Sequence, residues 1–72
     1  MDWARLLKDL RSELLLSQVE MADLLGVSFA SINRWENGHH EPTIKIKRQI
    51  KDLSKKNKLD FSSYMKDGET NA

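Results

Sequence analysis

The sequence has no cysteine, one proline and three glycines among its 72 residues. Without cysteine, neither a disulfide framework nor a thiolate zinc site can stabilise the chain. The longest apolar run, Leu14–Leu16, is far shorter than the roughly 20 residues that cross a bilayer. The first residues also lack the basic start and apolar stretch of a secretory signal. These absences predict a small cytoplasmic domain with one hydrophobic core and no membrane partner.

The groups that catalysis requires are also scarce. The sequence shows no cluster with metal-ligand spacing, and the adjacent His39 and His40 lack further ligands, so we expect no metal and no cofactor. No nucleophile lies near a plausible base, and acidic residues such as Asp9 fit solvated helix faces. A bundle this small is expected to lack a substrate pocket of about 300 Å³ or more. The sequence therefore predicts that the protein is not an enzyme.

Charge is unevenly distributed, although the net charge is only +1. Residues 41–58 carry seven Lys/Arg and two Asp/Glu, whereas the segments before and after them are each slightly acidic. A locally basic segment can attract phosphate. A solvated helix face gives the same pattern, and charge alone favours that simpler interpretation.

Apolar residues recur at spacings of three and four, which is typical of amphipathic helices. The pattern predicts a helix from the N-cap Asp2 to about Glu13. A later helix is expected to follow the N-cap candidate Thr43 and to end within residues 54–58.

A short fifth helix is expected over residues 60–65. It would place Phe61 in the core, whereas Tyr64 and Met65 could serve either the core or a dimer contact. Residues 1–66 are thus expected to form one all-α domain of four to five helices. Residues 67–72 have no apolar anchor and are expected to form a mobile tail.

Two short helices joined by a tight turn are predicted in the middle of the chain. Ser17 and Glu20 form a capping box that begins the first of them. Gly26 ends this helix, because glycine adopts left-handed geometry without steric cost. Ser28 caps the second helix, which is predicted over residues 29–37. This arrangement is that of a helix-turn-helix, whose second helix lies in the major groove of DNA.

The residues of this segment resemble the phage repressor and Cro family of helix-turn-helix domains. The matching pattern is Gln18, Ala22, Gly26-Val27-Ser28 and Ile32-Asn33-Arg34-Trp35-Glu36-Asn37-Gly38, and the resemblance covers about residues 3–53. It implies a compact lambda-repressor-like bundle that regulates transcription and binds double-stranded DNA. It also implies a homodimer on a pseudo-palindromic site, in a prokaryotic or phage setting and associated with the nucleoid.

One position departs from the family pattern. The family often has glycine, or another residue tolerant of left-handed geometry, where this chain has Leu15. A left-handed leucine costs about 1 kcal/mol relative to glycine. We therefore expect the turn before Ser17 to adopt a different geometry.

Base contacts are expected from the outward side of the helix over residues 29–37. Arg34 can bond to guanine O6 and N7, and Asn33 can bond to adenine N6 and N7. Phe29 and Ala30 begin the helix, where the groove is closest. Phe29 could contact a thymine methyl group or fold back against Trp35, and the sequence does not decide between these positions.

Phosphate contacts are expected around the two helices. Gln18 begins the first of them, where free backbone N–H groups suit an anion, and the resemblance implies the same role. Further candidates flank the second helix or begin the later basic helix: Ser31, Asn37, His39, His40, Lys45 and Lys47. The lysines near the end of the basic helix are expected to be solvated.

The resemblance also implies a structural ion pair between Arg11 and Glu36. An alternative function on the same fold is a protein-interaction adapter or antitoxin-like module. Its contact surface would then be Phe61, Tyr64 and Met65. Such a module would bind a protein partner and would itself show no salt-sensitive affinity for DNA.

Overall fold

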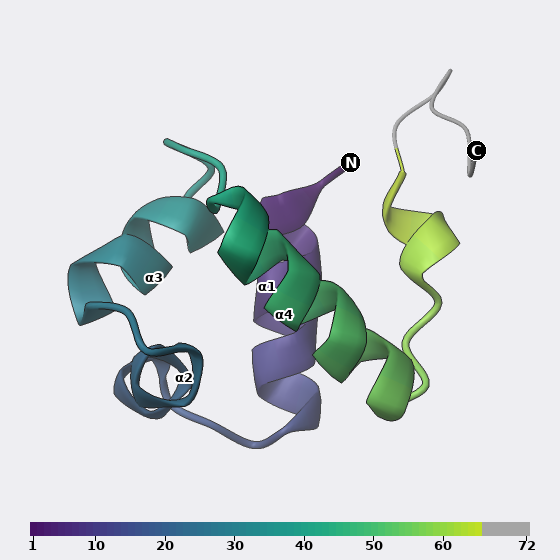
Figure 1. Cartoon of the computed structure of the whole chain (residues 1–72), viewed down its shortest axis with the longest axis horizontal. Coiled ribbons are helices and arrows are strands. Elements are labelled where there is room, and N and C mark those ends of the chain that lie inside the picture. The colour runs from purple at the N-terminus through teal and green to yellow at the C-terminus, as the bar shows by residue number, and fades with distance from the viewer. Residues whose placement is uncertain (66–72) are drawn as a thin grey trace.

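The structure, a computed structural model, describes residues 1–65. The tail expected at residues 67–72 lies outside the described residues. The elements in chain order are α1 (Trp3–Glu13), α2 (Gln18–Leu25), α3 (Phe29–Glu36), α4 (Ile44–Lys56) and a 3₁₀ turn, η1 (Phe61–Tyr64). Residues 1–65 contain no strand, so the all-α fold expected from the sequence is confirmed. Figure 1 shows α1 and α4 crossing at the centre, with α2 and α3 on one side and η1 on the other.

Each α-helix begins at a side-chain cap that the sequence predicts. The caps are Asp2, Ser17, Ser28 and Thr43, and each accepts a hydrogen bond from the backbone N–H three residues later. At Ser17 the capping box is complete, because its own N–H donates to Glu20 Oε1 at 2.9 Å. That bond lowers the pKa of Glu20 below its ordinary value.

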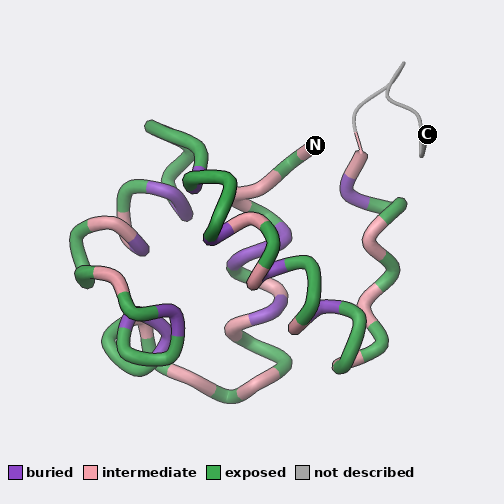
Figure 2. The backbone as a smooth tube through the Cα atoms, in the orientation of Figure 1, coloured by how far each residue is buried: buried purple, intermediate pink, exposed green. Residues whose placement is uncertain are grey.

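The hydrophobic core is built by the four α-helices: α1 packs against α3 and α4, and α2 packs against α3. Figure 2 shows the buried stretches of these helices turned toward the centre of the molecule. The core side chains are Leu6, Leu7, Leu10, Met21, Ala22, Leu25, Ile32, Trp35, Ile46, Ile50 and Tyr64. Trp35 is therefore a structural residue, as its position on the inner side of its helix predicts.

The 3₁₀ turn η1 is fastened to α1. Tyr64 is only 6% exposed, and its hydroxyl donates to Asp9 Oδ2 at 2.5 Å. The backbone N–H of Asp2 donates to the Tyr64 carbonyl at 2.7 Å, and the Arg5 guanidinium lies over the Tyr64 ring. The bond to Asp9, together with burial, raises the pKa of Tyr64. This bond therefore stabilises the fold below the ordinary tyrosine pKa and is lost as the pH rises through the raised value.

These contacts change two expectations. Asp9 is not a purely solvated residue of α1, because it accepts the Tyr64 hydroxyl. Tyr64 belongs to the core, so it is not available as part of a surface made with Phe61 and Met65. Phe61 is partly buried and packs against the core, as expected.

All four α-helices end in the same hydrogen-bonded turn, which places one residue in left-handed geometry. These residues are Leu15, Gly26, Gly38 and Lys58, with φ of 57°, 71°, 75° and 59°. After α1, the N–H of Leu16 donates to the Arg11 carbonyl and that of Leu15 to the Ser12 carbonyl, which is a Schellman motif.

The expectation that the turn at Leu15 has another geometry is wrong. The side chains on either side, Leu14 and Leu16, both pack against the core. The chain must reverse between them, so Leu15 takes the left-handed position and its side chain is 90% exposed.

Leu15→Gly should raise the free energy of unfolding by about 1 kcal/mol, because it removes the left-handed strain without removing buried surface. Urea denaturation followed by circular dichroism measures the change. Leu15→Ala is the matched control, since alanine also has a Cβ atom and keeps the strain. Equal stability of the two variants would show that the turn is not strained.

Candidate nucleic-acid interface

The turn between α2 and α3 has the geometry of a helix-turn-helix. Gly26 is left-handed, Ser28 is extended and caps the N-terminus of α3, and Val27 between them packs against the core. Ala22 and Ile32 are buried. A small side chain at Ala22 allows α2 and α3 to approach closely.

A buried carboxylate joins the first three helices. The Glu36 side chain, in the last turn of α3, is only 3% exposed. Its two oxygens accept hydrogen bonds from Arg11 of α1, Nε to Oε2 at 2.7 Å and Nη2 to Oε1 at 3.0 Å. Oε1 also accepts from Gln18 Nε2 of α2 at 3.1 Å. Such two-pronged arginine–carboxylate pairs are geometrically specific, and this pairing raises the pKa of Arg11.

Arg11 also holds the turn that follows its own helix. Its Nη1 donates to the Leu16 carbonyl at 3.1 Å. One guanidinium therefore fixes both the turn that leads into α2 and the end of α3. The ion pair implied by the resemblance is thus present. The hydrogen bond from Arg11 to the Leu16 carbonyl and the one from Gln18 to Glu36 could not be predicted from the spacing of residues in the sequence.

The hydrogen-bonded network continues along α3. Asn33 Nδ2 donates to Gln18 Oε1 at 3.4 Å, and Asn37 Nδ2 donates to Asn33 Oδ1 at 3.1 Å. Asn33 is therefore partly buried rather than fully outward. Each of the Gln18 and Asn33 amides keeps one N–H without a hydrogen bond among the described residues, because a side-chain amide has two.

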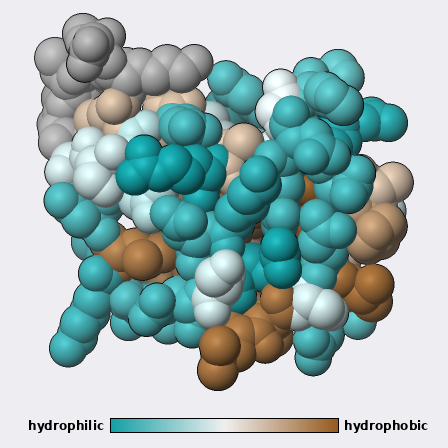
Figure 3. Space-filling model, turned by 180° about the vertical axis from the view of Figure 1, so that it is seen from behind, coloured by the Kyte–Doolittle hydropathy of each residue, from teal (hydrophilic) through white to brown (hydrophobic). Residues whose placement is uncertain are grey.

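The exposed side of α3 carries Phe29, Ala30 and Arg34. Phe29 is 49% exposed, so it does not fold back into the core beside Trp35. Arg34 has no ion-pair partner among residues 1–65. In Figure 3, which views the molecule from behind, hydrophobic side chains appear along the lower edge and on the side of α2 and α3.

The expected phosphate-binding residues are not all in equivalent positions. Ser31 is partly buried and its hydroxyl is hydrogen-bonded to that of Ser28 at 3.0 Å. The exposed ones are Asn37, His39, His40 and Lys45. Lys47 differs from these, because its ammonium donates to Glu41 at 2.7 Å and lies over the Trp3 ring. We therefore do not assign Lys47 to a DNA contact.

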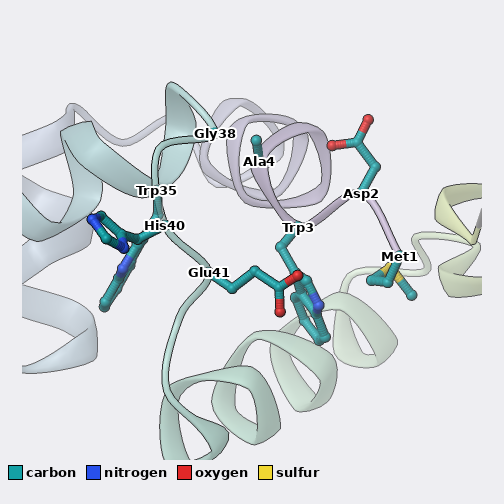
Figure 4. A pocket seen from close by; sticks show the side chains of 8 residues that line it. All are labelled: Met1, Asp2, Trp3, Ala4, Trp35, Gly38, His40 and Glu41. Carbon is teal, nitrogen blue, oxygen red and sulfur yellow. The ribbon is translucent and has the colours of Figure 1, made fainter.

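Two hollows lie outside the helix-turn-helix. Figure 4 shows the loop residues Gly38, His40 and Glu41 facing residues 1–4 across a pocket of about 200 Å³. An open groove of about 370 Å³ lies between α1, α4 and η1, and it is a surface hollow rather than an enclosed substrate pocket. Within residues 1–65, no three potential metal-ligating side chains gather in one place. In the same part of the chain, no helix is long and apolar enough to cross a membrane.

Comparison with known proteins gives one match. A sequence model of the helix-turn-helix family matches residues 7–50, more than half of the chain. The chain belongs to this family. The matched segment runs from α1 into α4 and includes Arg11, Gln18 and Glu36, and it agrees with the phage repressor and Cro type expected from the sequence. No curated protein and no solved structure matches the chain.

Membership of this helix-turn-helix family supports a DNA-binding regulator in general. Family members use the second helix of the motif, here α3, to enter the major groove. On the exposed side of α3, the side chains in position for such contacts are Phe29, Ala30 and Arg34.

Arg11→Met should lower the free energy of unfolding by about 3 kcal/mol, because it leaves the buried Glu36 carboxylate without its cation. Urea denaturation at neutral pH measures the loss. Lys8→Met is the matched control, since Lys8 is exposed on the same helix, and it should change stability by less than about 0.5 kcal/mol.

The double variant Arg11→Met with Glu36→Met shows whether the stability lost in Arg11→Met comes from the unpaired Glu36 charge or from lost packing. Replacing both partners by apolar side chains should recover most of the lost stability. A double variant no more stable than Arg11→Met would contradict the role given to the Glu36 charge.

Proposed function

We propose that the protein is a sequence-specific DNA-binding regulator of transcription, with α3 in the major groove. The observation that carries the proposal is the exposed side of α3. It presents Arg34, which has no ion-pair partner within residues 1–65, and an exposed phenylalanine on a helix fixed by the Glu36 network. A rigid helix with free donors is what direct base recognition requires.

The proposed base contacts follow the chemistry of each side chain. Arg34 donates to O6 and N7 of a guanine, and Phe29 and Ala30 contact thymine methyl groups. Asn33 reaches an adenine only through its remaining N–H and its free lone pair, because the network uses the others. We therefore expect Arg34 to contribute more specificity than Asn33.

The proposed phosphate contacts surround this helix. The N-terminus of α2, together with the unused N–H of Gln18, faces one phosphate. The others come from Ser31, Asn37, His39, His40 and Lys45. These contacts would fix the position of the protein on the duplex and add salt-dependent affinity, but they would not distinguish one base sequence from another.

We further propose that two copies bind one operator. The exposed side of a single α3 presents few base-reading side chains, so a pseudo-palindrome with half-sites about 10 bp apart would supply the missing specificity. Such a regulator would act on the nucleoid in the cytoplasm.

Selection from a randomised duplex pool at about 150 mM salt tests the proposal, with specific binding expected to exceed nonspecific binding at least about a thousandfold. The expected product is an enriched site with two inverted half-sites. Arg34→Ala should then weaken binding by about 1–3 kcal/mol for each half-site and relax the preference at one position in each.

Lys55→Ala is the matched control, because it also removes one exposed cation but lies at the end of α4. It should leave the preferred sequence unchanged. Retention of DNA only at low salt, without an enriched sequence, would contradict sequence-specific regulation and would leave non-specific phosphate attraction.

A further inference from the structure

A second surface lies on the opposite side of the molecule from α2. It is the groove of about 370 Å³ between the start of α1, α4 and η1, called here the α4 groove. Its lining residues are Trp3, Ile44, Lys47, Arg48, Lys51 and Phe61. Figure 1 shows α1 and α4 lying between η1 and the α2–α3 pair.

The floor of the α4 groove is aromatic. The Trp3 and Phe61 rings meet edge to face, with centroids 5.9 Å apart. The Lys47 ammonium lies 5.2 Å from the centre of the Trp3 ring, and the Lys51 ammonium lies 5.4 Å from that of Phe61. These cation–π contacts hold two positive charges beside an apolar floor.

The rim combines an exposed aliphatic side chain with unneutralised charge. Ile44 is 62% exposed and adds an aliphatic side chain to this rim. Lys47, Arg48 and Lys51 follow it at helical spacings of three, four and seven, so all share one side of α4. Lys47 pairs with Glu41, but within residues 1–65 no carboxylate pairs with Arg48 or Lys51.

We propose that the α4 groove binds an acidic segment of a partner protein, in which an aliphatic or aromatic side chain is flanked by Asp or Glu. The apolar side chain would pack on Ile44 and the two rings, and the carboxylates would pair with Arg48 and Lys51. This occupant matches both the sign of the charge and the apolar floor.

A DNA phosphate backbone fits this surface less well. It would neutralise the cations, but it has no apolar group to cover Ile44, Trp3 or Phe61. Protein interfaces, in contrast, combine a central apolar contact with a charged rim. The proposal does not depend on DNA binding by α3, because the two surfaces share no residue.

The test uses the full chain and a display library of randomised linear peptides as the probe. Enriched peptides should combine acidic residues with at least one large apolar residue. The double variant Arg48→Glu with Lys51→Glu should bind a labelled enriched peptide at least about tenfold more weakly. Ile44→Ser should also weaken binding, because it removes apolar contact without changing charge.

The double variant Lys8→Glu with Lys56→Glu is the matched control, because it changes net charge equally at exposed residues outside the groove. It should bind the peptide within about twofold of the unchanged chain. Circular dichroism melts verify that every variant is folded.

Three results would overturn the proposal. One is an absence of enriched peptides, and another is enrichment without acidic residues. The third is equal weakening by the control variant, which would show a general effect of net charge. If Arg48→Glu with Lys51→Glu instead abolishes binding to duplex DNA and no peptide binds, the groove contacts nucleic acid.

Discussion

The buried carboxylate of Glu36 is the group on which the arrangement of the first three helices depends. A charge that is 3% exposed is tolerated only when it is paired and hydrogen-bonded. Arg11 supplies the opposite charge from α1, and Gln18 supplies a further N–H from α2. Because Glu36 ends α3, these bonds set how α3 lies against α2. The orientation of the helix proposed to read DNA is therefore set from its buried side, and Phe29, Ala30 and Arg34 lie on its exposed side.

The same fold separates two kinds of surface. On the side of α2 and α3, the exposed groups include Arg34, Asn37 and Phe29, which are side chains suited to contacts with bases and phosphates. On the side of α4 and η1, Lys47, Arg48 and Lys51 surround two aromatic rings, a combination suited to an acidic apolar segment. The basic residues of positions 41–58 therefore do not form a single positively charged surface. Lys47 and Lys51 lie over rings of the α4 groove, whereas Lys45 lies over no ring within residues 1–65.

Features that depend on local chemistry could be predicted from the sequence. The four N-caps have side chains that accept a backbone hydrogen bond, and Gly26 and Gly38 mark two of the four helix ends. The other two ends fall at Leu15 and Lys58, and neither leucine nor lysine is a residue type that signals a left-handed turn. Features that depend on tertiary contact were also missed. The bond between Gln18 and Asn33, the pairing of Asp9 with Tyr64 and the position of Lys47 over the Trp3 ring all join residues that are distant in sequence.

The most direct measurement is a map of amide chemical-shift changes when isotope-labelled protein is titrated with duplex DNA. If α3 enters the major groove, the largest changes fall on residues 28–37 and on the first turn of α2. The amides of η1 should change little, because η1 lies across the molecule from α2 and α3. Changes centred on α4 and η1, with residues 28–37 unaffected, would contradict the assignment of α3 as the DNA-reading helix.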